Sequence, residues 1–143
     1  MGTISAFRKV IWLVALGLAA ATPSQAGQSF GLCSLTSANH CVVDGDTIEV
    51  KGQRIRMIDY DTPEISEPKC PSEEALGQKA KLRLLRLLNS GVVEIRKVGT
   101  RDEDRYGRKL RLVLVDGRSV GDTLIREGLA WPWQGRRHRW CGE

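Results

Sequence analysis

The chain has 143 residues, of which 41% are hydrophobic and 27% are charged. It is basic, because 22 Lys and Arg residues stand against 17 Asp and Glu residues and give a formal net charge of +5. This length and composition predict one globular domain with a hydrophobic core and exclude two domains of ordinary size.

The N-terminus has the pattern of a signal peptide. Arg8 and Lys9 precede the apolar run "VIWLVALGLAAA" of residues 10–21, and small residues stand three and one positions before Gly27. The run is about 12 residues long, short of the roughly 20 that a membrane-spanning helix needs. We therefore expect cleavage after Ala26, secretion or export to the periplasm, and no stable membrane association afterwards. Loss of Arg8 and Lys9 leaves a net charge of +3 on residues 27–143.

The four cysteines favour disulfides in an exported chain, because they would meet oxidising conditions. Arithmetic allows three connectivities, and the sequence has no Cys-x-x-Cys pattern that would indicate a zinc site. One pair lies close in sequence around a polar stretch, and the other would close a long loop that holds the C-terminus. We favour Cys33 with Cys41 and Cys70 with Cys141.

The predicted elements begin after a loose N-terminal arm over residues 27–40, which is rich in Gly, Ser, Gln and Asn. Apolar and β-branched patterns predict strands around "CVVDGDTIEV" (41–50), "RIRMI" (54–58), "VVEIRKV" (92–98) and "LRLVLV" (110–115). Helical spacing predicts one helix from about Pro71 to Leu88 and a shorter one over about 119–127, with Gly128 as its C-cap. This order indicates a small α+β domain, residues 41–143, on a curled antiparallel sheet.

Carboxylates gather at the ends of these predicted strands. Asp44 and Asp46 belong to "DGDT", and Asp61 and Glu64 belong to "DTPE". Clustered hard oxygen ligands are what Ca²⁺ or Mg²⁺ selects. Each motif alone also fits an ordinary turn, so a metal site requires the two motifs to converge in space.

Arginines accompany the acids. Arg56 precedes Asp61 by five residues, and "DEDRYGRKL" presents Arg105, Tyr106 and Arg108 before another predicted strand. These arginines fit plain salt bridges. They also fit a phosphodiester site, because a guanidinium can bind two phosphate oxygens beside a metal held by carboxylates.

Four motifs together resemble the staphylococcal nuclease (thermonuclease) family: "VDGDT", "RIRMIDYDTPE", "DRYGRKL" and "VGDTLIREGLA". They occur in the family's order and approximate spacing, from Cys41 to about Ala130. The resemblance implies a mainly β, α+β fold, an OB-type five-stranded barrel with two or three packed helices.

The resemblance also implies a role for each residue of these motifs. Asp46, Asp61 and the backbone carbonyl of Thr62 match the family's Ca²⁺ ligands, with Asp44 nearby, bound through water. Glu64 matches the general base. Arg56 and Arg108 match the arginines that bind the scissile phosphate, and Arg105 and Tyr106 match contacts to a terminal phosphate. Asp59 stands where the family has an apolar residue, so we expect it to make a structural contact or point outward.

We therefore predict a monomeric, Ca²⁺-dependent nuclease that hydrolyses DNA, RNA or both by attack of water and leaves a 5′-hydroxyl and a 3′-phosphate, as the resemblance implies. Two alternatives are an inactive OB-fold module that binds nucleic acid and an exported Ca²⁺-stabilised domain that binds protein or saccharide. The C-terminal "WPWQGRRHRWCGE" is too short for the family's final long helix. Its aromatic and basic residues fit either substrate contacts or a core cap with a solvated tail; they are Trp131, Trp133, Arg136, Arg137 and Arg139.

Overall fold

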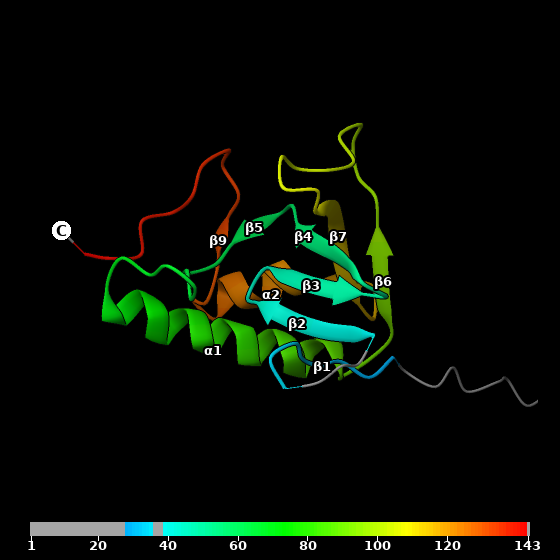
Figure 1. Cartoon of the computed structure of the whole chain (residues 1–143), viewed down its shortest axis with the longest axis horizontal. Helices are drawn as coiled ribbons and strands as arrows, with labels where there is room; N and C mark the ends of the chain where they lie inside the picture. The colour runs from blue at the N-terminus through cyan, green and yellow to red at the C-terminus, as the bar shows by residue number, and fades with distance from the viewer. Residues whose placement is uncertain (1–27, 36–38, 143) are drawn as a thin grey trace, which may run out of the picture.

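The computed structural model describes residues 28–35 and 39–142 (Figure 1). The predicted signal peptide, residues 1–26, lies outside the described residues. Within the described ranges, no helix has the length and apolar character needed to cross a membrane.

Five strands of a seven-stranded curled sheet form an OB-type barrel. They are β2 (His40–Asp44), β3 (Thr47–Val50), β4 (Gln53–Met57), β6 (Val93–Arg96) and β7 (Lys109–Val115), arranged in the order β2-β3-β4-β7-β6. The predicted α+β, mainly β fold is confirmed, but the prediction of an antiparallel sheet is wrong, because the sheet is mixed. β4 and β7 run parallel, because the chain between them crosses over through a long helix and β6 before it returns.

Two helices pack on the barrel. α1 (Pro71–Leu88) lies along one side of it in Figure 1, and α2 (Val120–Arg126) follows the short strand β8 (Arg118–Ser119). The fully buried side chains of Leu84 and Leu88 in α1 and Leu124 in α2 join the strand residues in one core. Both helices lie close to their predicted bounds, and Pro71 begins α1 as its first helical residue.

Within the described part of the N-terminal arm, residues 30–32 are packed where the sequence predicted a loose segment. Strand β1 (Gly31–Leu32) pairs parallel with β2, and Phe30 is buried in the core. The backbone N–H of Phe30 donates to Asn89 Oδ1 at 2.9 Å. The buried Phe30 ring and the β1–β2 pairing therefore attach this arm to the barrel. The polar composition of the arm does not predict this attachment.

The C-terminal segment, residues 131–141, forms a strap over one side of the barrel. It begins as β9 (Trp131–Pro132), which pairs antiparallel with β5 (Tyr60–Asp61). In Figure 1 it runs on in red toward the N-terminal end of α1. There the Cys70–Cys141 disulfide closes a separation of 71 residues, while Cys33–Cys41 closes one of 8. The structure thus contains both disulfides that the sequence favoured.

Candidate functional site

The tight turn between β2 and β3 places the first acidic pair. Asp46 is buried, and its Oδ1 and Oδ2 accept hydrogen bonds from Thr47 Oγ1 at 3.1 Å and from the Thr62 backbone N–H at 3.3 Å. A Cβ at Gly45 would lie 2.8 Å from Thr62 Oγ1, so glycine permits this close approach. The bond to Thr62 joins the "DGDT" and "DTPE" motifs, and the two motifs converge as the metal hypothesis requires.

Arg56, on β4, bridges the acids of both motifs. Its Nη1 lies 3.0 Å from Asp46 Oδ2, and its Nη2 lies 3.3 Å from Asp61 Oδ1. Nη1 also donates to the backbone carbonyls of Met57 and Tyr60. The register that pairs Arg56 with Thr47 sets this position, so backbone pairing aims the guanidinium between the two carboxylates.

Burial raises the pKa of two carboxyl groups here. The pKa of Asp44 rises to about 7 because the group is buried and because the negative charge of Asp46 is close. The pKa of Asp61 is raised by burial, against the opposing effects of Arg137, the His138 N–H and Arg56. Buried carboxylates favour a cation beside them.

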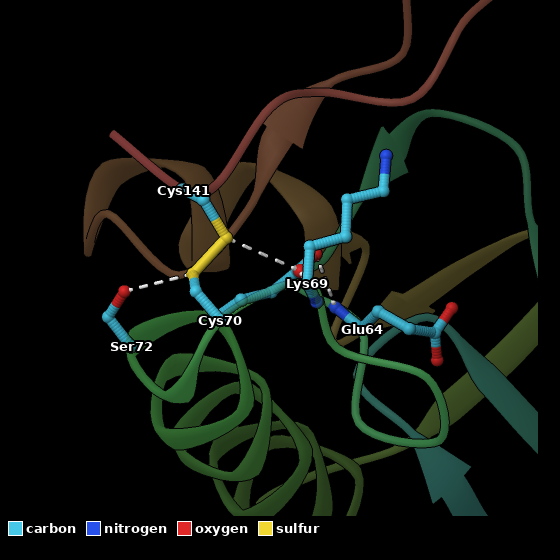
Figure 2. The surroundings of a disulfide bond; sticks show 6 residues. Glu64, Lys69, Cys70, Ser72 and Cys141 are labelled. Atoms are coloured by element: carbon cyan, nitrogen blue, oxygen red, sulfur yellow. Dashed lines mark hydrogen bonds between the residues drawn. A yellow bond between two sulfur atoms is a disulfide. The ribbon is translucent and has the colours of Figure 1, made fainter. Parts of the chain in front are cut away.

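Glu64 lies in the loop between β5 and α1, where a second acid holds the backbone. The Glu64 N–H donates to Glu73 Oε1 at 3.2 Å, and the Lys69 N–H donates to Glu73 Oε2 at 2.7 Å. Figure 2 shows the Glu64 carboxylate pointing away from the neighbouring disulfide. Its Oε1 accepts from the N–H groups of Ile65 and Ser66, so the backbone fixes one of its two oxygens.

Arg108 and Tyr106 come from the turn before β7. Asp104 organises this turn, because its Oδ1 accepts from both their N–H groups and its Oδ2 lies 2.6 Å from Arg108 Nε. Arg108 Nη1 reaches Thr47 Oγ1 at 3.5 Å. Tyr106 is 67% exposed, with the guanidinium of Arg105 4.8 Å from its ring centroid. The turn thus presents two arginines and an exposed ring beside the acids.

One pocket of about 240 Å³ collects these side chains. The predicted site residues all line it except Asp61, which is only 1% exposed. Lining residues from the motifs are Asp44, Asp46, Arg56, Thr62, Pro63, Glu64, Arg105, Tyr106 and Arg108, joined by Trp133 and Arg137 of the C-terminal segment. The pocket therefore combines oxygen donors with guanidinium groups, an arrangement that suits a metal ion and a phosphate together.

Asp59 lies outside this pocket. Its Oδ2 accepts from Ser119 Oγ at 2.6 Å, and Ser119 is the N-cap of α2. Asp59 therefore makes a structural contact, one of the two alternatives that the sequence left open.

Arg137 lies beside Glu64, a position that the sequence did not predict, because Arg137 is one of several similar arginines in the tail. Its Nη1 lies 2.8 Å from Glu64 Oε2, its Nη2 donates to the Thr62 carbonyl at 3.2 Å, and its Nε lies 3.5 Å from Asp61 Oδ1. The signal was present in the cysteines. Cys70 follows Glu64 by six residues and Cys141 follows Arg137 by four, so the favoured disulfide already brings the two segments together.

Trp131 and Trp133 do not cap the core, because their side chains are 45% and 42% exposed. The Trp131 ring stacks on His138 with centroids 4.2 Å apart, and the Arg56 guanidinium lies 5.7 Å from the Trp133 ring centroid. Trp133 therefore forms part of the pocket wall, whereas Trp131 is stacked within the strap.

The donor atoms fit a hard cation. Asp46, Asp61 and the Thr62 carbonyl offer oxygen atoms alone, which suits Ca²⁺ or Mg²⁺ and does not suit a soft metal. Elsewhere in the described residues, one oxygen of Glu73 and the sulfurs of Cys70 and Cys141 lie within 4.8 Å of one another. Both sulfurs are consumed in the disulfide, so that group is not a metal site.

In a comparison with known protein families, residues 54–140 match the family described as "Staphylococcal nuclease homologue". Endonuclease YncB of Bacillus subtilis is 40% identical over 92 residues, which cover 62% of this chain and 43% of that protein. The SPbeta prophage-derived endonuclease YokF of the same organism is 40% identical over 92 residues, covering 62% of this chain and 31% of that protein. The chain thus spans less than half the length of either relative.

Thermonuclease of Staphylococcus hyicus is 33% identical over 125 residues, which cover 82% of this chain and 73% of that protein. This match extends over most of both chains.

Proposed function

Because the chain belongs to the staphylococcal nuclease family, we propose that it is a nuclease that hydrolyses phosphodiester bonds of DNA, RNA or both with the help of Ca²⁺. The observation that carries the proposal is the pocket in which Asp46, Arg56, Glu64 and Arg108 meet. A salt-bridge network that served stability alone would not need a pocket open to a substrate.

The Ca²⁺ site of the proposal consists of Asp46, Asp61 and the Thr62 carbonyl, with Asp44 nearby. A bound cation would place positive charge next to a nonbridging oxygen of the substrate phosphate. The acids support this assignment, because the carboxylates of Asp46 and Asp61 both pair with Arg56, and the carboxylate of Asp44 lies beside Asp46 and accepts a hydrogen bond from its backbone N–H.

Glu64 is the general base of the proposal. Its Oε1 is held by two backbone N–H groups, and a carboxylate oxygen can accept two hydrogen bonds. Oε2 therefore retains capacity for a water molecule besides its contact with Arg137. In this position Glu64 can orient the water and take its proton as the water attacks phosphorus.

Arg56 and Arg108 bind the phosphate in the proposal, and they stabilise the charge that builds on its oxygens in the transition state. Arg105 and Tyr106 lie at the exposed rim, where they can contact a terminal phosphate. Trp133 offers an exposed ring for a base.

The test is cleavage of plasmid DNA and of RNA by the purified, disulfide-bonded protein, with Ca²⁺, with Mg²⁺ and with excess chelator. We expect cleavage with Ca²⁺, less with Mg²⁺ because it demands tighter octahedral geometry, and none with chelator. Glu64→Gln should lower turnover by roughly 10²- to 10⁴-fold. The matched control is Glu67→Gln, an exposed acid of the same loop, which should cleave normally.

Each outcome of this assay separates the proposal from its alternatives. Full cleavage in chelator would overturn the metal role. A protein that binds nucleic acid without cleaving it would be the inactive OB-fold module. A protein that binds Ca²⁺ but no nucleic acid would be the exported calcium-stabilised domain.

Export is the remaining part of the proposal, and we place the protein in the periplasm or the medium. The two disulfides support it, because such bonds persist in oxidising compartments. Mass spectrometry of the exported protein should find a chain that begins at Gly27 and has no free thiol. A cytoplasmic protein with an intact N-terminus would contradict export.

A further inference from the structure

Glu64 depends on supports that the barrel strands do not provide. It lies in a loop between β5 and α1, and its contacts come from α1, from its own loop and from the strap. Glu73 holds its backbone N–H, and the neighbouring N–H groups of Ile65 and Ser66 hold Oε1. None of these contacts restrains Oε2, the oxygen available for a water molecule.

Arg137 provides that restraint. Its guanidinium donates to Glu64 Oε2 at 2.8 Å and at the same time to the Thr62 carbonyl at 3.2 Å. One planar group thus connects the carboxylate of Glu64 to the backbone two residues earlier. A planar guanidinium that bridges two acceptors in this way limits rotation of the glutamate side chain, which a single point charge would not do.

The strap places Arg137 through attachments on both sides. Before it, β9 pairs with β5, and the Trp133 N–H donates to the Asp59 carbonyl at 3.0 Å. After it, the His138 N–H donates to Asp61 Oδ2 at 3.0 Å, and Cys141 is bonded to Cys70. Within residues 131–141 the structure shows no helix, so these attachments set the course of the strap.

The Cys70–Cys141 disulfide lies next to the other support of Glu64 as well. Cys141 Sγ is 3.8 Å from Glu73 Oε2, and Cys70 Sγ accepts from Ser72 Oγ at 3.2 Å, since a disulfide sulfur carries no hydrogen (Figure 2). Glu73, buried under the loop, holds the backbone N–H groups of Glu64 and Lys69. The crosslink that anchors the end of the strap after Arg137 therefore also lies against the residue that fixes the Glu64 backbone.

We propose that Arg137 is a positioning residue that holds the Glu64 carboxylate for hydrolysis, and that the Cys70–Cys141 disulfide anchors it in this position. The inference rests on the proposed function, because it assigns Arg137 a role through the general base. Arg137 is 54% exposed in its side chain, so its ion pair contributes little to folding stability. Its removal should therefore change turnover far more than melting temperature.

The test is a double-mutant cycle on steady-state cleavage kinetics, made with Arg137→Ala, Glu64→Gln and the two combined. Arg137→Ala should lower kcat by about 10- to 100-fold with little change in KM. In the Glu64→Gln background it should cost less than about threefold, because a residue that acts through Glu64 has nothing left to position. Arg137→Lys should recover only part of the loss, and Arg86→Ala, an exposed arginine of α1, should behave as wild type.

The disulfide is tested in the same assay. The Cys70→Ser/Cys141→Ser double variant should lose turnover by a factor similar to Arg137→Ala, and adding Arg137→Ala to it should cost little more. The Cys33→Ser/Cys41→Ser variant should keep its turnover. Full additivity in either cycle would overturn the proposal, as would higher turnover in Arg137→Ala. A KM defect shared by Arg136→Ala and Arg137→Ala would instead show a general phosphate-binding tail.

A second measurement does not depend on activity. Amide hydrogen exchange at Ile65 and Ser66 should become faster in Arg137→Ala than in wild type, because the loop loses one restraint. A folded wild-type protein that cleaves nothing would overturn the proposed function, while the exchange rates would still report whether Arg137 restrains this loop. Unchanged exchange together with unchanged turnover would overturn the positioning role itself.

Discussion

Two sides of the same pocket are built differently. On the strand side, Asp46, Arg56 and Arg108 are placed by the β2–β3 turn, by β4 and by the turn before β7. Strand register places Arg56 opposite Thr47 and Leu110, and Asp46 and Arg108 come directly before strands of the same sheet. On the strap side, Glu64 and Arg137 are placed by a loop and by a segment without helix, through side-chain contacts, the short β5–β9 pairing and one disulfide.

The two sides of the pocket are therefore held by different kinds of interaction. Strand pairing is cooperative, so losing one side chain leaves the backbone of the strand side in place. The strap side rests on a few separate contacts, and each of them carries a larger share of the geometry. We expect substitutions on the strand side to remove a chemical group, and substitutions on the strap side to misplace one.

The sharpest test of the strand side is Arg56→Lys. Lysine keeps the charge but loses the fork that spans Asp46 and Asp61. We expect turnover to fall by roughly 10²- to 10³-fold, as for removal of one transition-state donor, while circular dichroism shows a folded barrel. Near-normal turnover would mean that Arg56 acts through its charge alone.

Removing each disulfide compares the strap side with the distant arm. Loop closure over 71 residues should be worth about 4 kcal/mol and closure over 8 residues about 2.5 kcal/mol in the chain-entropy account. Denaturant unfolding should therefore show the larger loss for Cys70→Ser/Cys141→Ser. Equal losses would indicate that native-state contacts, and not loop length, decide the stabilisation.

Gly77→Ala tests the strap side by displacing the loop that carries Glu64. A Cβ at this position of α1 would lie 2.7 Å from the Pro63 carbonyl and 2.5 Å from Ile65 Cγ2. Alanine normally favours a helix over glycine, but here the Glu64 loop must shift, so we expect a loss of about 1–3 kcal/mol in the free energy of unfolding. Turnover should fall by about tenfold as Glu64 moves. A more stable, fully active variant would show that the loop adapts without cost.

Asp59→Asn should have the smallest effect. Asparagine keeps an oxygen that can accept from Ser119 Oγ, and burial already raises the pKa of Asp59, so a neutral group is tolerated. We expect turnover and Ca²⁺ dependence like those of wild type, with little change in melting temperature. A folded but inactive variant, beside a near-normal Glu64→Gln enzyme, would show that the acid cluster is assigned in the wrong register.

The sequence by itself determined the barrel elements and the strand side of the pocket. Apolar alternation, the Pro71 start of α1 and the Asp-Gly turn are local signals, and the four motifs carry their side chains on those elements at fixed spacing. The direction of β7 beside β4 was not predictable in this way, because it depends on how the intervening crossover packs. The buried Phe30 was hidden for a similar reason, since its partners are distant in the chain.

Only the tertiary structure decided the position of Arg137. Three arginines of the tail look alike in sequence, and 73 residues separate Arg137 from Glu64. The β5–β9 pairing and the Cys70–Cys141 disulfide bring the two together. Local signals report only what a residue does with its near neighbours, whereas this contact depends on the closure of a long loop, whose geometry no short motif encodes.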